Sequence, residues 1–268
     1  MPNWVVNKIK FSGTKENIDK VLDIIKGDDD VIDFNKLIPM PKSLNLTSGS
    51  ITNESIVYAL NQKGVEERNH VIEKLKNTRC YFYGNYYNTI KNIDNERIER
   101  ALERFNSDRR SPFDQSIYEE LGIKTFDDLG NAYIDNILEY GYDTWYDWSC
   151  DKWGTKWGAC ESYMETENTL MFNTAWSAPF PILKKLAEIC HENKVEFAGK
   201  WADEDTGCNT GVFECYDDEF WYDYMENQSS DAYEIYVELW GASNCIGQDE
   251  DGNWTHYDCY DCPNKEYC

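Results

Sequence analysis

The start of the chain predicts a strand followed by a helix. Residues 4–11 are rich in β-branched and aromatic side chains, and apolar positions alternate there with lysines. Ser12, Gly13 and Thr14 then provide a turn and a helix N-cap. The next apolar residues recur at helical spacing and are closed by Gly27: Ile18, Val21, Leu22 and Ile25. In the segment 33–41, two prolines, Pro39 and Pro41, exclude a regular helix.

The middle of the chain has mainly helical periodicity. Residues 42–54 are rich in Ser, Thr and Asn and predict an exposed loop, whereas residues 55–141 predict helices. Two apolar stripes support this prediction. They comprise Ile98, Ala101, Leu102 and Phe105 in one helix, and Leu129, Tyr133, Ile134 and Leu138 in another.

The last third returns to mixed character. Residues 162–174 predict one strand, and Ser177 is expected to cap a helix whose first turn holds two prolines. Residues 195–202 and 211–216 predict two further strands, with a turn at Gly207 between them. A last helix is expected near residues 232–240.

Joined in order, these elements predict an α+β fold, a ferredoxin-like βαββαβ sandwich with a long helical insertion. We expect the ferredoxin-like domain to be discontinuous, formed by residues 1–45 and 140–217. Residues 46–139 would form the insertion, and residues 218–268 an acidic extension rich in Cys and His.

Charge is distributed very unevenly along the chain. Residues 1–112 hold 16 acidic and 18 basic residues, whereas residues 113–268 hold 34 acidic and 8 basic ones. Within residues 201–268 there are 18 acidic residues against a single base, Lys265. Such a field repels nucleic acid and anionic lipid and attracts cations or basic proteins. Solubility or a salty cytosol is the simpler explanation of the acidity, but the interleaved Trp and Tyr favour a basic partner.

The apolar content, 41% with 15% aromatic residues, predicts a folded chain with a core. No stretch of 18 apolar residues occurs, and the first residues do not resemble a signal peptide. We therefore expect a cytoplasmic location in the host cell and no membrane partner.

Four segments of the chain have a distinctive wording: Met1-Pro-Asn-Trp4, Phe34-Asn-Lys-Leu-Ile-Pro-Met-Pro41, Trp153-Gly-Thr-Lys-Trp157 and Phe172-Asn-Thr-Ala-Trp176-Ser-Ala-Pro179. In this order they resemble the YubB-type ferredoxin-like proteins of phages and plasmids. The resemblance covers residues 1–45 and 140–217. It implies a ferredoxin-like fold and an origin in a mobile element. It implies no activity and no iron–sulfur cluster, which would need four suitably spaced cysteines.

The C-terminal cysteines and a histidine suggest a metal site. In a reducing cytosol, clustered Cys and His side chains indicate zinc before disulfides, and a Cys-x2-Cys pair can supply two of four ligands. Reduced free thiols and disulfides are the alternatives, because a second Cys-x2-Cys pair is missing. The candidate ligands of one structural zinc are Cys245, His256, Cys259, Cys262 and Cys268.

Two acidic groups and one tryptophan are candidates for binding the basic partner. They are Asp203, Glu204, Asp205, Asp217, Asp218, Glu219, Trp221 and Asp223. Neither group has the spacing of an EF-hand, and solvated surface is the simpler interpretation of both. The motif at 153–157 permits an aromatic cage for an anion or a base, although closure of the core is the more economical interpretation.

The sequence contains no complete catalytic signature, so whether the protein is an enzyme stays open. The first hypothesis is a non-enzymatic inhibitor from a mobile element, which would occupy the phosphate site of a nucleic-acid-binding host protein. Anti-CRISPR or anti-restriction action would be an example, since carboxylates meet Arg side chains much as phosphates do. The alternatives are a zinc-stabilised interaction module and an enzyme acting on a small or cationic substrate. A pocket holding carboxylates of raised pKa would favour the enzyme.

Overall fold

The computed structural model describes residues 3–49, 51–80, 83–107, 112–217, 219–241 and 245–257, with the side chains of 112–114 excepted. The chain divides into two compact units. Met1–Pro39 together with Lys152–Cys268 form one, here called the ferredoxin-like unit, and Met40–Asp151 form the helical unit. The predicted insertion, 46–139, lies inside the helical unit.

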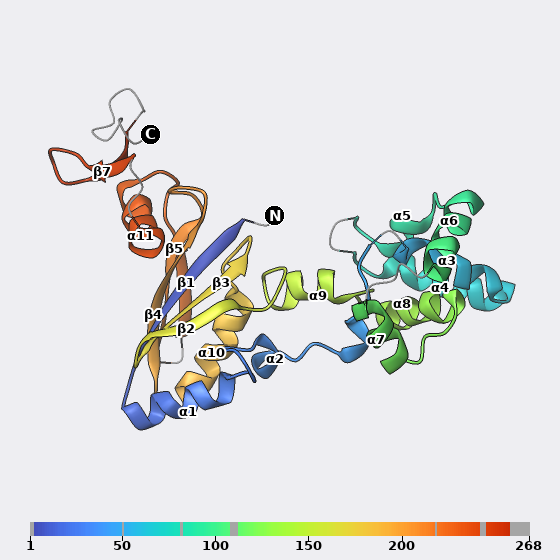
Figure 1. Ribbon diagram of the computed structural model, residues 1–268, viewed down its shortest axis with the longest axis horizontal. Helices are drawn as coiled ribbons and strands as arrows, with labels where there is room; N and C mark the ends of the chain where they lie inside the picture. Colours follow the sequence, from blue (N-terminus) through green and yellow to red (C-terminus); the bar gives the residue numbers. More distant parts are fainter. Residues whose placement is uncertain are drawn as a thin grey trace. The chain divides into compact units, whose positions relative to one another are not determined.

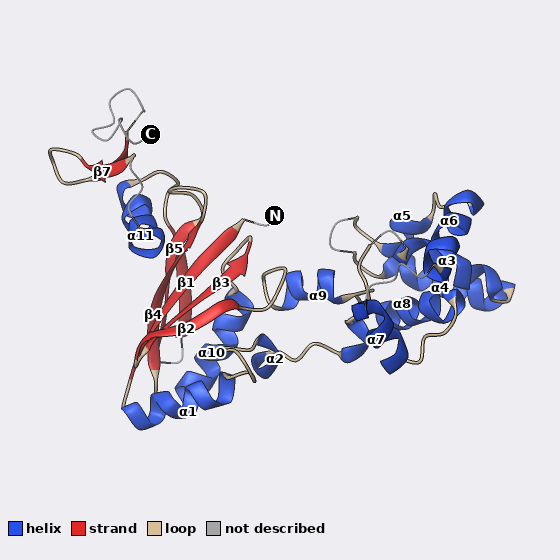
Figure 2. Cartoon of the chain, in the orientation of Figure 1, coloured by secondary structure: helices blue, strands red, loops and turns tan. Residues whose placement is uncertain are grey.

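The ferredoxin-like unit is built on one antiparallel sheet of six strands in the order β2-β3-β1-β4-β5-β6. Figure 2 shows these strands in red. Their bounds are β1 Trp4–Ser12, β2 Cys160–Thr166, β3 Thr169–Ala175, β4 Glu196–Asp203, β5 Thr210–Tyr216 and β6 Glu219–Tyr224. Strands β2, β3, β1 and β4, with helices α1 and α10, have the order of a ferredoxin-like βαββαβ sandwich. The predicted fold class is confirmed.

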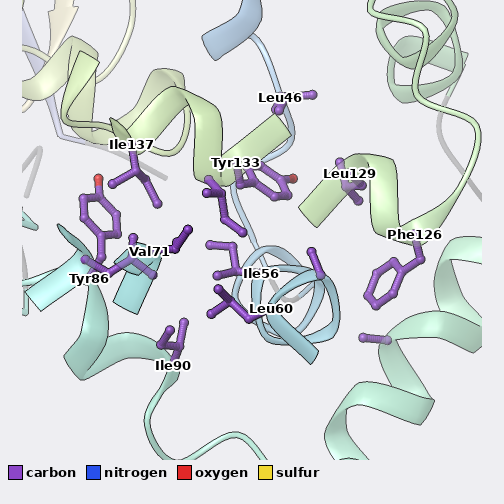
Figure 3. Packing of buried hydrophobic residues seen from close by; sticks show 14 of the residues in the cluster. Leu46, Ile56, Leu60, Val71, Tyr86, Ile90, Phe126, Leu129, Tyr133 and Ile137 are labelled. Carbon is purple, nitrogen blue, oxygen red and sulfur yellow. The ribbon is translucent and has the colours of Figure 1, made fainter. Parts of the chain in front are cut away.

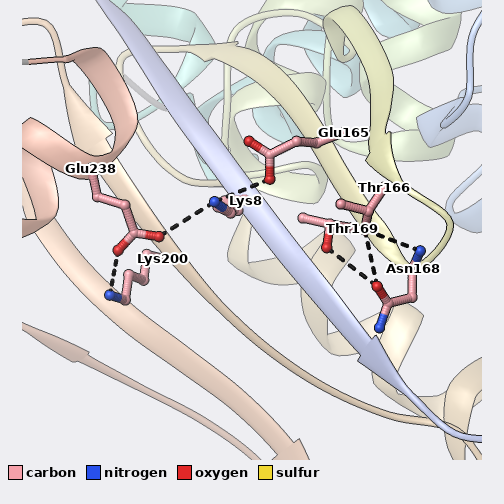
Figure 4. Close-up of polar contacts among 7 residues, drawn as sticks. All are labelled: Lys8, Glu165, Thr166, Asn168, Thr169, Lys200 and Glu238. Atoms are coloured by element: carbon pink, nitrogen blue, oxygen red, sulfur yellow. Dashed lines mark hydrogen bonds and ion pairs between the residues drawn. The ribbon is translucent and has the colours of Figure 1, made fainter.

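One predicted strand was wrong, because the structure has two strands in its place, and these two strands complete the ferredoxin-like topology. Residues 162–174 form the β2–β3 hairpin rather than a single strand. Asn168 makes the turn, where its side chain accepts from Thr166 and donates to the backbone oxygen of Phe11. Figure 4 shows the polar contacts around this turn. The β-rich composition on both sides hid the break, because the turn carries no Gly or Pro.

Three helices cover one face of the sheet: α1 Lys15–Ile25, the short α2 Phe34–Leu37 and α10 Phe180–Glu192. They are labelled in Figure 1. The single helical turn of α2 lies in the segment 33–41, where no regular helix was predicted, and it ends at Leu37 because Ile38, which precedes Pro39, is extended. The sheet face below them holds the buried core: Val5, Ile9, Phe11, Leu170, Phe172, Phe197, Trp201 and Phe213. Gly211 is required here because the indole of Trp201, its neighbour on β4, lies where a Cβ would be. The cap predicted at Ser177 was wrong, since α10 begins after Pro179 and Ser177 donates to Gly154 instead.

Helix α11, Ser230–Trp240, packs on the opposite face of the sheet. This matches the helix predicted near residues 232–240. Its Glu238 bridges Lys8 of β1 at 3.4 Å and Lys200 of β4 at 2.5 Å, as Figure 4 shows. The indole of Trp240 donates to the backbone oxygen of Ala202. The short hairpin of β7 Ile246–Gln248 and β8 Trp254–His256 follows the helix.

The described helices of the helical unit are η1 Lys42–Leu44, α3 Thr52–Gln62, α4 Val65–Asn77, α5 Tyr86–Ile90, α6 Asn95–Asn106, α7 Pro112–Glu120, α8 Phe126–Tyr140 and α9 Trp145–Lys152. Helix α9 extends one residue beyond the end of the unit at Asp151. Both predicted apolar stripes face its core, part of which Figure 3 shows. Helices α3 and α8 pack closely against each other. Gly130 of α8 makes this approach possible, because a Cβ there would collide with the backbone oxygen of Ser55.

Among the described helices, none is both long and apolar enough to cross a membrane.

Candidate functional site

The predicted acidic residues are spread along strands β4 to β6. The pairing of Ala202 with Thr210 places residues 203–205 at one end of these strands. The pairing of Tyr216 with Glu219 places Asp217 and Glu219 at the other end. Asp223 pairs with Val212 and so lies nearer the end that holds residues 203–205. Strands of this length span roughly 20 Å, so Asp217 and Glu219 do not form one continuous patch with residues 203–205.

The first group mainly organises the β4–β5 loop. Asp203 is only 5% exposed. Its carboxylate accepts hydrogen bonds from the Asn209 side chain at 3.1 Å and from the backbone N–H of Asp205 at 2.9 Å. Asp205 in turn accepts from the side chain of Asn3 at 2.9 Å. Glu204 is exposed, and its N–H donates to Trp4. These contacts give two of the three acids a role in holding the loop.

The second group lies on an open edge of the sheet. Strand β6 is the outermost strand beside β5, and in the described part of the chain no strand pairs with its outer side. Its residues are almost all exposed, with Trp221 at 45%, Tyr222 at 47% and Tyr224 at 52%. Glu219 and Asp223 are exposed on the same face as Trp221, because alternate residues of a strand share a face. We call residues 216–224, without Asp218, the anionic edge.

Asp218 lies outside the described residues. Asp217 beside it is exposed and adopts a φ of 48°, which makes the tight β5–β6 turn. Acidic side chains tolerate this left-handed conformation better than most, so the turn itself contributes to the choice of Asp here.

The motif at 153–157 is largely structural, as the simpler interpretation predicted. Trp153 is buried, and its indole donates to the backbone oxygen of Ile38 at 2.9 Å. Thr155 bonds both backbone groups of Ala175. The ammonium of Lys156 lies over the rings of Trp157 and Trp176, at 4.6 and 5.0 Å from their centroids. One face of each of these two rings is thus occupied by the protein's own lysine.

The predicted zinc ligands are only partly placed. Cys245 lies directly before β7, and its backbone oxygen accepts from Tyr257, so it adjoins His256 on one hairpin. The ring of His256 stacks on Tyr233 of α11, 6.4 Å away between centroids. Cys259, Cys262 and Cys268 lie outside the described residues. Within the described ranges, no three His, Cys, Asp or Glu side chains gather closely enough to bind a metal.

The helical unit contains a site that sequence reasoning missed. A cavity of about 350 Å³ lies among α3, α5 and α9, with two carboxylates, Asp143 and Asp147, in its wall. Asp147 is 6% exposed, and the thiol of Cys80 lies 3.6 Å from its Oδ2. Burial, together with the nearby charge of Asp147, raises the pKa of Asp143 to about 6. Asp143 and Asp147 are four residues apart, but nothing in the sequence connects them with Cys80.

The fold and these sites define an α+β protein with a ferredoxin-like domain. Residues 152–240 match the family model described as "Ferredoxin-like domain in Api92-like protein". The match covers strands β2 to β6 with α10 and α11 and gives no support to the YubB-type name. No curated protein matches the sequence.

One solved structure, a crystal structure of the protein api92 from Yersinia pseudotuberculosis, is similar to the chain. The identity is 11% and the TM-score 0.37, over 84% of this chain and 99% of that one. This likeness is too weak to carry an argument about fold or function.

Proposed function

We propose that the ferredoxin-like unit is an anionic binding module that takes a basic protein at its anionic edge. The observation that carries this proposal is strand β6, where acidic and aromatic side chains are exposed together on a strand whose outer side pairs with no other strand of the described chain. Trp and Tyr are the residues that most often dominate protein interfaces, and Glu219 and Asp223 add charge beside Trp221.

The backbone of the edge offers a second means of binding. An outer strand has free N–H and C=O groups on alternate residues, and an extended segment of a partner can pair with them. The partner's side chains would then meet one face bearing Glu219, Trp221 and Asp223. A segment in which Lys or Arg alternates with apolar residues would complement this face in both charge and shape.

The charge of the surroundings favours the same class of partner. Within residues 201–268, Lys265 is the single base against 18 acidic residues. Such a field accelerates encounter with basic proteins and repels nucleic acid itself. Nucleic-acid-binding proteins are the basic proteins whose Arg clusters are shaped for phosphate, and carboxylates satisfy the same Arg geometry. We therefore propose a nucleic-acid-binding host protein as the partner, with inhibition of a defence system of the anti-CRISPR or anti-restriction type as the consequence. Origin in a mobile element is part of this proposal.

The test compares how strongly an edge variant and a matched control variant bind host proteins. A triple variant, Asp217→Asn, Glu219→Gln and Asp223→Asn, removes three charges from the edge. A matched control, Asp19→Asn, Asp23→Asn and Glu192→Gln, removes three exposed charges from α1 and α10. Both are immobilised and exposed to host extract, and captured proteins are identified and rebound in purified form.

We expect a purified nucleic-acid-binding protein to bind the wild type and the control equally and the edge variant about tenfold more weakly. Its own nucleic acid should displace it, and binding should weaken at higher salt. Equal loss in both variants would show that overall charge, and not the edge, attracts the partner. Recovery of no nucleic-acid-binding protein at low salt would refute the proposal.

A further inference from the structure

Arginine is confined to one part of this chain. All seven arginines lie within residues 68–110 of the helical unit, whereas the ferredoxin-like unit has 13 lysines and no arginine. The two residue types carry the same charge but differ in chemistry. Arg presents a planar fork of N–H donors that binds phosphate or carboxylate oxygens in pairs, whereas Lys acts as a hydrated point charge. The helical unit therefore holds every side chain of this protein that is shaped for bidentate recognition of an anion.

Three of these arginines line a single hollow in the helical unit, about 260 Å³ in volume. Arg97, Arg100 and Arg104 follow one another at i, i+3 and i+7 on α6, so they share one face of this helix. Ala101 lines the hollow between them, and its small side chain leaves room among the longer ones. The rest of the wall comes from the start of α3 and the loop before it. Packing of α3 near α6 thus forms the hollow.

The lining of this hollow is basic in a strongly acidic protein. Among the described residues that line it, Glu54 is the single acid beside the three arginines. The whole chain has a net charge of −24, but residues 40–151 hold 19 acidic and 13 basic residues, a net of −6. Most of the negative charge therefore belongs to the other unit. A local excess of base on an acidic chain attracts small anions to this one place.

Glu54 orders the first arginine of the hollow. Its carboxylate is nearly buried, and its Oε1 accepts from Nε of Arg97 at 3.1 Å and from Nη2 at 2.6 Å. A guanidinium group has five N–H donors, so Arg97 keeps further donors for a ligand. Its side chain is 44% exposed and thus accessible. Because the side chain is already ordered, it loses less conformational entropy when an anion binds.

The second arginine is held by a contact that an anion can replace. Nη1 of Arg100 pairs with Glu96 of the same helix at 2.5 Å, and the two side chains are 60% and 76% exposed. Exposed pairs of this kind contribute at most about 1 kcal/mol, whereas Arg binds phosphate through charge-assisted and frequently bidentate hydrogen bonds. None of the three arginines has to lack a partner, because one guanidinium group can donate to a carboxylate and to a phosphate together.

We propose that this hollow binds the phosphate group of a small molecule, held by Arg97, Arg100 and Arg104. A phosphate group offers three strong acceptor oxygens and up to two negative charges, so it can meet three guanidinium groups at once, whereas a carboxylate offers two oxygens. The amide of Asn53 lines the hollow and adds N–H donors. The volume lies slightly below that of a typical pocket for a drug-sized ligand, which favours a compact anion.

Nucleic acid is a poorer match for this site. A strand with many phosphates meets the repulsion of the whole acidic chain, whereas a single phosphate group meets mainly the charge within about 10 Å of it. The hollow is also separate from the anionic edge, since every described residue that lines it belongs to the helical unit. The proposal therefore stands apart from the function proposed for that edge.

The test uses the full chain and isothermal titration calorimetry with inorganic pyrophosphate near neutral pH, without added metal. Acetate and a short DNA duplex are the comparison ligands. Arg100→Gln and Arg104→Gln each remove one guanidinium group from the hollow. Arg68→Gln removes the same charge from an exposed position on α4 in the same unit. Arg97 is left unchanged, because its replacement would leave Glu54 buried and unpaired. Circular dichroism of each variant verifies that the helices are retained.

We expect saturable binding of one pyrophosphate per chain and no measurable binding of acetate. The affinity should fall about tenfold in Arg100→Gln and in Arg104→Gln and stay unchanged in Arg68→Gln. Absence of pyrophosphate binding would refute the proposal. Equal weakening by Arg68→Gln would also refute it, because the attraction would then come from general charge. Tighter binding of the duplex, weakened by the same two variants, would overturn it in favour of nucleic acid.

Discussion

Replacing Asp143 by Asn should stabilise the helical unit, and the gain should depend on pH. Burial and the charge of Asp147 raise the pKa of Asp143 from 3.8 to about 6. When folding raises the pKa of a carboxyl group, the group contributes stability that is fully present below its pKa in the unfolded chain. This contribution to the free energy of unfolding is lost as the pH rises through the pKa of the folded state. Ionised Asp143 is thus unfavourable above about pH 6.

The magnitude follows from the shift. A change of one pKa unit corresponds to 1.36 kcal/mol, so the shift from 3.8 to about 6 corresponds to about 3 kcal/mol. Asn has the shape of Asp without its charge, so Asp143→Asn should recover up to this amount at about pH 8 and nothing below about pH 4. Thr144 donates weakly to the Asp143 carboxylate at 3.4 Å, and part of that bond would be lost.

The assay is urea unfolding followed by far-ultraviolet circular dichroism, which is dominated by the helices, at several pH values between about 4 and 8. Asp135→Asn, exposed on α8, is the control and should change stability little at any pH. A variant no more stable than wild type at high pH would refute the reasoning, because it would show that ionised Asp143 is fully compensated in the fold. A constant gain at every pH would refute it too, since the charge would not be its cause.

Three further predictions concern packing, a buried charge and the metal. Gly130→Ala should destabilise the helical unit by at least about 2 kcal/mol in denaturant unfolding, because α3 and α8 must separate. Gly64→Ala, whose Cβ meets nothing but which replaces the N-cap of α4, should cost less than about 1 kcal/mol. Equal effects would contradict the close approach. Arg97→Met should cost about 3 kcal/mol by leaving Glu54 buried and unpaired, and adding Glu54→Leu should restore most of it in a double-mutant cycle. No recovery would mean that Arg97 acts through packing. Elemental analysis should find about one zinc per chain, reduced in Cys262→Ser; a value near zero would exclude the zinc site.

Periodicity predicted the elements well where one face of an element is buried. The apolar stripes at 98–105 and 129–138 face the core of the helical unit in the structure. The alternation of apolar and polar residues at 4–11 correctly predicted strand β1. The β2–β3 hairpin was missed because its turn contains Asn168 but neither Gly nor Pro, between two β-rich segments. Strand β6 was assigned to the extension, because its nearly complete exposure leaves no alternation between buried and exposed positions to detect.

The candidate sites were predictable only as far as they are local. The sequence was enough to locate the acidic segment and Trp221 within it. It did not predict that Asp203 is only 5% exposed, because that burial accompanies hydrogen bonds from the side chains of Asn3 and Asn209. The carboxylate cavity depends on bringing Cys80 to residues 143–147. A contact across more than sixty residues leaves no trace in spacing, so only the folded unit reveals it.

The position of β1 within the sheet has a consequence for how the protein is made. Trp4–Ser12 is the first strand to be synthesised, yet its partners β3 and β4 lie more than 150 residues later, beyond the helical unit. Contacts of such sequence separation form slowly, because a long loop must close before they stabilise anything. The helical unit is continuous in sequence and has its own core, so it can fold while the ribosome is still producing the sheet. Until α10 emerges, the apolar face of β1 with Val5, Ile9 and Phe11 lacks part of its cover, and until β4 emerges one edge of β1 lacks its partner. The nascent chain is then open to chaperones and to misassembly.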